Sequence, residues 1–186
     1  MKCSIIKSIL VGLLSLVAII SLAYTITPKT YAGSYAKAAS AMKWALNIAN
    51  DNSYTYGYGK GKCPICYGYK DKDLKQFVCT KFITAAYAHG AKDSEMQKWC
   101  KKGSKPKVKD LKKAMKKSKR WKYLGKPKCK NMVGGEVVFY GNSHVEMYFG
   151  NNSTIGAHGK DGYSKKNSIS VRKMKSGYTE VYKYVG

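Results

Sequence analysis

Acidic residues are scarce in this sequence. Ten Asp and Glu stand against 35 Lys and Arg among 186 residues, which gives a net charge of +25. An imbalance of this size excludes a self-neutralising surface and indicates affinity for polyanions. Histidine is scarcer still, with three residues, so any site that needs an imidazole must draw on these three. The chain has no internal repeat, which excludes a repeat architecture.

Hydrophobic residues, in contrast, are sufficient for a folded core. They make up 44% of the chain, and 16 residues are Tyr. This composition excludes gross disorder. After removal of an export signal, the remaining length would be that of one domain.

The N-terminal segment indicates export. Lys2 and Lys7 precede an apolar run, and small residues flank a cleavage position after Ala32. We therefore expect residues 1–32 to be a signal peptide of a secreted or cell-surface bacterial protein. The alternative is a retained membrane anchor over residues 8–24, because the apolar run of about 17 residues is only slightly shorter than the roughly 20 that span a bilayer.

Cleavage after Ala32 would leave a strongly basic protein. Residues 1–32 hold three lysines and no acid, so the charge would fall from +25 to +22. Anionic wall polymers or an anionic membrane surface are the expected partners. We expect no specific recognition of nucleic acid and a monomeric protein.

The order of elements predicts an α+β fold, because helical patterns come first and strand patterns follow. Helices are expected over residues 33–52, 78–89, 93–102 and 107–118, and the last two belong to a lysine-rich insert near residues 93–130. Residues 53–77 are rich in Gly and Tyr and are predicted to be a loop. Five strands are expected to form an antiparallel meander, namely Glu136–Tyr140, His144–Phe149, Thr154–His158, Ser168–Met174 and Thr179–Tyr184.

Three residues form a candidate catalytic group. Cys79 lies at a predicted helix start, where unpaired N–H groups and the helix dipole favour a thiolate. His144 begins a strand after a tight turn and is the candidate base. His158 lies on the neighbouring strand, from which it would orient the imidazole of His144. His89 is expected only to complement a helix C-terminus.

This succession resembles the NlpC-type cell-wall cysteine peptidases, a papain-like family. The resemblance covers roughly residues 40–160. The matching stretches are Trp44–Asp51, Tyr54–Gly57, Phe77–Tyr87, Gly134–Phe139, Ser143–Asn151 and Ile155–His158. It implies that residues 33–186 form a single papain-like domain, with N-terminal helices packed on a C-terminal antiparallel sheet.

The resemblance also implies an activity: hydrolysis of an amide bond in the peptide stem of peptidoglycan. Cys79 would attack, His144 would transfer the proton and His158 would orient His144. N–H groups at the helix start, with the Tyr56 hydroxyl, would stabilise the oxyanion. Two departures stand out. Val78 and Thr80 replace the family's usual Asp and Ser around the cysteine, and Gly156 stands where the third catalytic residue more usually falls.

The other cysteines fit more than one chemistry. Cys63 and Cys66 have the spacing of a zinc knuckle or a redox pair, and Cys100 and Cys129 could complete a four-cysteine zinc site. Outside the cell, two disulfides are chemically natural and are favoured over zinc, and free thiols are the third alternative. No second Cys-x-x-Cys motif supports zinc, and no thioredoxin-like pattern supports a redox enzyme. No cofactor is expected for catalysis.

Two other functions fit the sequence. One is a catalytically degenerate, polyanion-binding surface protein, which the basic charge and Val78 favour. The other is a secreted papain-like effector or toxin that cleaves amides outside murein, which the export signal permits.

Overall fold

The structure is a computed structural model that describes residues 29–57, 63–68, 75–101, 107–158 and 168–186. Most of the predicted signal peptide and the whole of the alternative anchor, residues 8–24, lie outside the described residues. The described helices are α2 (Lys29–Asn50), α3 (Cys79–Ala85), α4 (Ser94–Lys101) and α5 (Val108–Lys117), with a π-helical turn η2 (Ala86–Gly90) and a 3-10 turn η3 (Cys129–Asn131). Within the described ranges, no helix is both long and apolar enough to cross a bilayer.

Eight strands are described. Two short ones, β1 (Thr55–Tyr56) and β2 (Gln76–Phe77), form a parallel pair inside the segment predicted to be a loop. The other six form one antiparallel sheet, namely β3 (Trp121–Gly125), β4 (Val137–Tyr140), β5 (His144–Gly150), β6 (Ser153–Ala157), β7 (Ile169–Lys173) and β8 (Glu180–Tyr184).

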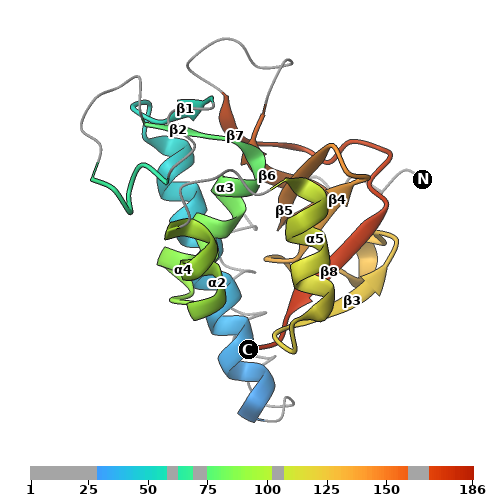
Figure 1. The fold of residues 1–186 in the computed structure, drawn as a ribbon. Helices are drawn as coiled ribbons and strands as arrows, with labels where there is room; N and C mark the ends of the chain where they lie inside the picture. The colour runs from blue at the N-terminus through green and yellow to red at the C-terminus, as the bar shows by residue number, and fades with distance from the viewer. Residues whose placement is uncertain (1–28, 58–62, 69–74, 102–106, 159–167) are drawn as a thin grey trace, which may run out of the picture.

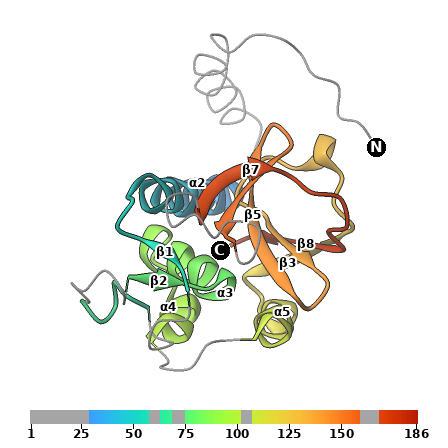
Figure 2. The same cartoon turned by 90° about the horizontal axis from the view of Figure 1, so that it is seen from above.

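Helices and sheet form two layers, which confirms the predicted α+β class. Figures 1 and 2 show α2, α3 and α4 grouped on one side, and the twisted sheet on the other. Helix α3 packs against β5 and β6, and α2 packs against β6, β7 and β8. The start of α3 is thereby held against the two strands that carry the candidate histidines.

The sheet order is β3-β8-β4-β5-β6-β7. The prediction of a simple meander is wrong for the last strand, because β8 pairs with β4 and β3 and not with β7. The backbone groups along the outer edge of β4 need partners, and β8 supplies them. Strand β3 was not predicted, because its residues do not alternate: Trp121 is buried and the next three residues are exposed.

Helix α2 begins four residues before the predicted start, so it runs through the predicted cleavage position. Its buried face consists of Ala38, Ala41, Ala45 and Ile48, spaced three or four residues apart. Small side chains on this face let the helix α3–η2 approach closely.

Gly90, at the end of η2, lies at this close approach. A Cβ there would lie 2.6 Å from the Ser40 carbonyl oxygen and 2.7 Å from the Ala41 Cα. A glycine at the end of a helical pattern is typical of a helix stop, but the left-handed residue after this helix is Lys92, with φ 54°. Gly90 is therefore required by packing against α2.

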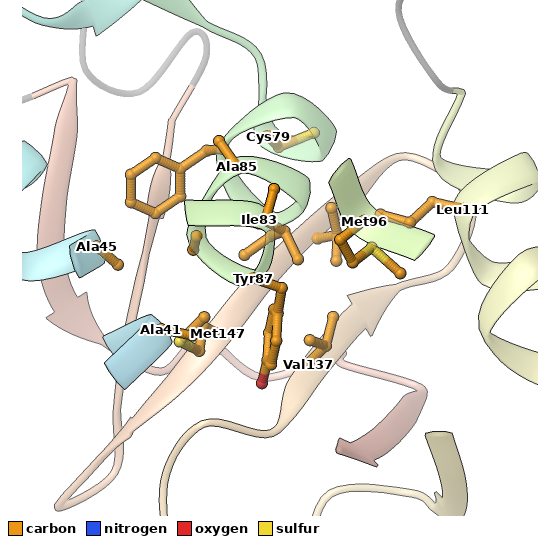
Figure 3. Close-up of a cluster of buried hydrophobic side chains, with 14 of the residues drawn as sticks. Ala41, Ala45, Cys79, Ile83, Ala85, Tyr87, Met96, Leu111, Val137 and Met147 are labelled. Atoms are coloured by element: carbon orange, nitrogen blue, oxygen red, sulfur yellow. The ribbon is translucent and has the colours of Figure 1, made fainter. Parts of the chain in front are cut away.

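The main core lies between the helices and the sheet, and Cys79 is at one end of it (Figure 3). Tyr87, at the centre, is fully buried and its hydroxyl donates to the Gly135 carbonyl. Burial raises the pKa of this hydroxyl well above its usual value. The phenol therefore remains a neutral donor that joins η2 to the segment before β4.

Asp93 fixes the start of α4. Its Oδ1 accepts a hydrogen bond from the Met96 N–H at 2.8 Å, in the manner of an N-cap. Its Oδ2 lies 2.6 Å from Arg120 Nη1 and 2.8 Å from the Tyr184 hydroxyl. Burial opposes ionisation, but the Met96 and Arg120 hydrogen bonds hold the pKa of this carboxyl below its usual value. One buried carboxylate thus joins α4 to β3 and β8.

Candidate active site

Cys79 is the first residue of α3, as the sequence predicts, and is buried to 7% exposure. The preceding Val78 has extended backbone angles and gives the helix no side-chain cap. The Phe82 N–H bonds the Val78 carbonyl at 2.9 Å. The departure at Val78 therefore removes a capping group and leaves the first N–H groups of α3 without a carboxylate bound to them.

His144 is the first residue of β5 and lies beside Cys79. Burial lowers the pKa of its imidazole, but the hydrogen bonds to Cys79 and Glu146, with the negative charge of both, raise the pKa to about 9. Nε2 of His144 lies 2.9 Å from Glu146 Oε1. The ring thus has Glu146 on Nε2, which leaves Nδ1 for the sulfur.

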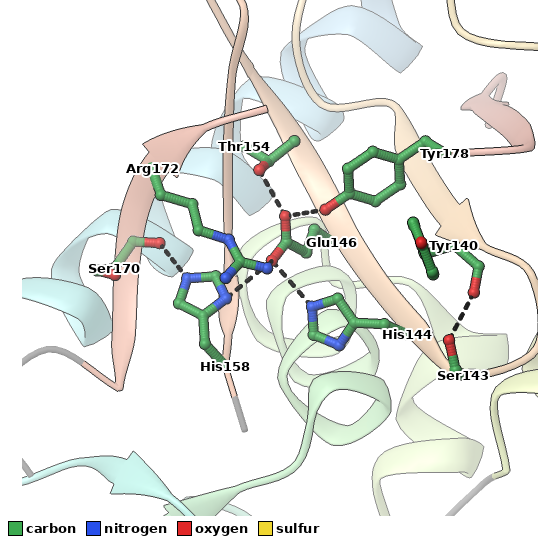
Figure 4. A network of polar contacts seen from close by, with 9 residues as sticks. All are labelled: Tyr140, Ser143, His144, Glu146, Thr154, His158, Ser170, Arg172 and Tyr178. Carbon is green, nitrogen blue, oxygen red and sulfur yellow. Dashed lines mark hydrogen bonds and ion pairs between the residues drawn. The ribbon is translucent and has the colours of Figure 1, made fainter. Parts of the chain in front are cut away.

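Glu146 is the functional candidate that the sequence analysis missed. Its side chain has no exposed surface, and Oε1 contacts His144 Nε2, His158 Nδ1 at 2.8 Å and Arg172 Nη2 at 2.6 Å. Its Oε2 accepts hydrogen bonds from the hydroxyls of Thr154 and Tyr178 (Figure 4). Burial opposes ionisation of Glu146, but the hydrogen bonds from His144 and His158 hold its pKa far below the usual range.

Strand register explains why these groups meet. In the β5–β6 pair, Met147 lies opposite Ile155. Continuing this antiparallel register places Glu146 opposite Gly156 and His144 opposite His158, all on one face of the sheet. A Cβ on Gly156 would lie 2.8 Å from Glu146 Cγ. The glycine at the position of the family's usual third residue therefore makes room for a carboxylate from the adjacent strand.

His158 follows β6 and is buried to 4% exposure. Its ring lies 6.2 Å from that of His144 between centroids, and the Glu146 carboxylate contacts both. Nε2 of His158 lies 3.1 Å from the Ser170 carbonyl oxygen. In this geometry, His158 reaches His144 through Glu146.

Tyr56 belongs to β1, whose partner strand ends two residues before Cys79. Its backbone N–H donates to Ser168 Oγ at 2.7 Å. The pair β1–β2 therefore brings the Tyr56 backbone to the same end of α3 as the candidate nucleophile. Figure 1 shows this pair beside the N-terminal end of α3.

Two lysines close to Cys79 in the sequence, Lys75 and Lys81, are engaged elsewhere. Lys75 Nζ lies 3.4 Å from Ser53 Oγ. Lys81 is buried, and its Nζ donates to the carbonyls of Trp99 and Cys100 at 3.1 and 3.3 Å. The positive group beside Cys79 is the imidazole of His144.

The predicted cysteine group is brought together only in part. Cys63, Cys66 and Cys100 meet, and the fourth member of the cluster is His89. Cys129 lies apart, with Sγ 3.2 Å from Asn152 Oδ1. No disulfide joins the five cysteines that the structure describes.

His144, Glu146 and His158 also have ligand atoms close enough to hold a metal. Both rings, however, direct their nitrogens at the same oxygen, Glu146 Oε1, and Arg172 adds a cation to that oxygen. A divalent ion would have to displace this guanidinium. The contacts favour a hydrogen-bonded chain that ends on Cys79.

A thiol at a helix start, an imidazole beside it and a buried carboxylate behind the imidazole are the groups that cysteine hydrolases use. No protein-family model matches the sequence, and no curated protein does. Among solved structures, the chain is similar to the P60 domain of antigen MAP1204 from M. avium subspecies paratuberculosis. Identity is 17%, coverage is 80% of this chain and 96% of that one, and the TM-score is 0.48.

It is also similar to the peptidoglycan hydrolase RipB from Mycobacterium tuberculosis. Identity is 19%, coverage is 87% of this chain and 69% of that one, and the TM-score is 0.46. Both are similarities to solved structures below 20% identity. They are similarities of fold, and the function proposed below rests on the side chains of this chain.

The titration of the site predicts a stability optimum. His144 stabilises the folded state fully below its unfolded pKa of 6.5, and this contribution is lost as pH rises through about 9. Glu146 has the opposite sign, because its contribution is present above 4.5 and is lost as pH falls. We expect the site to contribute most between pH 4.5 and 6.5, as measured by urea unfolding over a pH series. If His144→Gln lost as much stability as the wild type when pH rises into the alkaline range, this assignment would be contradicted.

Proposed function

We propose that this protein is an exported cysteine hydrolase that cleaves an amide bond in the peptide stem of bacterial peptidoglycan. Cys79 is the nucleophile, His144 is the general base and acid, and Glu146 holds His144 in place. The observation that carries the proposal is the continuous set of contacts from Cys79 to His144 to Glu146.

In the first half of the reaction, His144 takes the proton of Cys79 and the thiolate attacks the scissile carbonyl carbon. The negative charge that develops on the carbonyl oxygen faces the uncapped N–H groups at the start of α3. The Tyr56 hydroxyl is a second candidate donor to this oxygen. The tetrahedral intermediate collapses when His144 gives its proton to the leaving amine, which leaves an acyl-thioester on Cys79.

In the second half, water attacks the thioester and His144 accepts its proton. The imidazolium then returns a proton to the departing sulfur. Glu146 remains ionised throughout, because His158 and Arg172 supply positive charge or hydrogen bonds to it. His158 is thus a positioning residue that acts through Glu146.

Murein is the proposed substrate for two reasons. The sequence resemblance to the NlpC-type peptidases points to peptide stems. The charge of +22 after cleavage of the signal would hold the enzyme on anionic wall polymers. A degenerate scaffold is less well supported, because the buried Glu146 carboxylate holds the His144 ring in position beside Cys79.

Mass spectrometry of fragments released from purified peptidoglycan tests the proposal. The wild-type protein is expected to release muropeptides cleaved at one kind of amide bond, and Cys79→Ala is expected to release none. Cys129→Ala, at a cysteine distant from the site, is the matched control and is expected to retain activity. Equal release by Cys79→Ala would refute the mechanism. Cleavage of other amides with none of murein would instead support an effector or toxin.

A further inference from the structure

The cysteine cluster lies away from Cys79 and takes no part in the proposed reaction. Cys63 and Cys66 come from the segment between β1 and β2, His89 from η2, and Cys100 from the last turn of α4. Three separate segments therefore meet at one point. The first supplies two sulfurs, η2 supplies one nitrogen and α4 supplies one sulfur. All four ligand atoms lie within 4.8 Å of one another.

The spacing of His89 from the three sulfurs is that of a tetrahedral metal site. His89 Nε2 lies 3.7, 3.3 and 3.7 Å from the sulfurs of Cys63, Cys66 and Cys100. Zinc bonds of about 2.3 Å to sulfur and 2.0 Å to nitrogen, at tetrahedral angles, place sulfur and nitrogen about 3.5 Å apart. The three observed distances bracket this value.

A disulfide accounts for less of the geometry. Cys66 Sγ and Cys100 Sγ are 3.1 Å apart, whereas a disulfide requires about 2.05 Å. Pairing these two would leave Cys63 buried against His89 with no role for either. A metal uses all four side chains.

The donor set also favours a divalent cation. Three cysteines and one histidine are a ligand set that structural zinc takes, and each sulfur gives up its proton when it binds the metal.

The surroundings match those of a structural site. Trp44 stacks on the His89 ring, with centroids 5.6 Å apart and planes 17° from parallel. Three thiolates and one divalent ion leave a net charge of −1, and the buried Lys81 ammonium lies against the Cys100 carbonyl. Cys63 and Cys100 have no exposed surface. Four protein ligands that leave no position for water are typical of structural zinc.

We propose that Cys63, Cys66, His89 and Cys100 bind one structural Zn²⁺. Cys129 is not a ligand, and the histidine expected only to complement a helix end takes its place. The ion would fasten the Cys63–Cys66 segment and α4 to the end of the helix that begins with Cys79. The proposal does not depend on the hydrolase activity, since its ligands are separate from His144, Glu146 and His158.

Metal analysis of the purified full chain tests the proposal. Protein prepared with reductant is expected to contain one zinc ion per chain, as measured by inductively coupled plasma mass spectrometry. Cys66→Ser and His89→Gln are each expected to lose most of it. Two controls are expected to keep it: Cys129→Ser, at the cysteine outside the cluster, and His158→Gln, at the other group able to hold a metal.

A second measurement avoids variants that fail to fold. Replacement of zinc by Co²⁺ in the wild-type protein is expected to give the visible bands of tetrahedral cobalt and a near-ultraviolet thiolate charge-transfer band. Reduced wild-type protein without stoichiometric metal would overturn the proposal. So would an intact Cys66–Cys100 disulfide, or loss of zinc in Cys129→Ser or His158→Gln to the extent seen in Cys66→Ser.

Discussion

Replacement of Glu146 by Gln is expected to lower kcat on peptidoglycan by about 10²- to 10⁴-fold, the range that general acid–base catalysis contributes. Gln fills the same volume but has no charge. The imidazolium of His144 would lose the negative group on its Nε2 side, and its pKa would fall from about 9. Proton transfer from Cys79 would then be less favourable. The measurements are kcat over a pH series and the NMR titration of His144.

Glu180→Gln is the matched control for this variant. Glu180 lies on β8, outside the site, and is partly exposed. Its Oε1 lies 2.6 Å from Lys112 Nζ. Its replacement is expected to leave kcat and the His144 titration unchanged. A purely structural role for Glu146 would lower stability in Glu146→Gln but leave the His144 pKa near 9, and that result would contradict the proposed positioning.

Replacement of Asp93 by Ala is expected to lower the free energy of unfolding by about 2–4 kcal/mol, because it removes an N-cap and leaves a buried hydroxyl and a charged donor without their acceptor. The variant would leave Arg120 and the Tyr184 hydroxyl without their shared acceptor and would remove the cap from α4. Because α4 carries Cys100, part of the loss would come from the zinc ligands. Urea unfolding at neutral pH measures the effect.

Glu95→Ala is the matched control for Asp93→Ala. Glu95 lies in α4, and its carboxylate approaches the same Arg120, but at 4.0 Å and with a side chain that is 43% exposed. Exposed ion pairs contribute about 0–1 kcal/mol. A loss of stability as large in Glu95→Ala as in Asp93→Ala would show that burial of the carboxylate is not what matters.

The sequence predicted most elements but not how the last strand pairs. Helical patterns placed the continuous helix α3–η2, α4 and α5 within one residue of their observed bounds, because each element's own burial sets its pattern. The position of β8 depends on which edge of the sheet lacks a partner, and no local pattern carries this information. Similarly, Gly90 reads as a helix stop until α2 is placed against it.

For the candidate site, the sequence predicted positions but not every partner. Cys79 and His144 stand out as a helix start and a strand start. Glu146 lies two residues after His144 on the same face of the strand, and this alternation was a usable signal. A buried glutamate between Val145 and Met147 nevertheless reads as one polar residue in a strand. His89 could not be placed with the cysteines, because its neighbours come from segments distant in sequence.

The packing of Glu146 against Gly156 also has a consequence for how related sequences can vary. The two positions share one volume from opposite strands, and only one can be filled. A chain with a large polar side chain at the position of Gly156 must carry a small one at the position of Glu146. Natural variants should therefore change at both positions together, and an orienting group could pass from one strand to the other during evolution while the imidazole it holds stays in place.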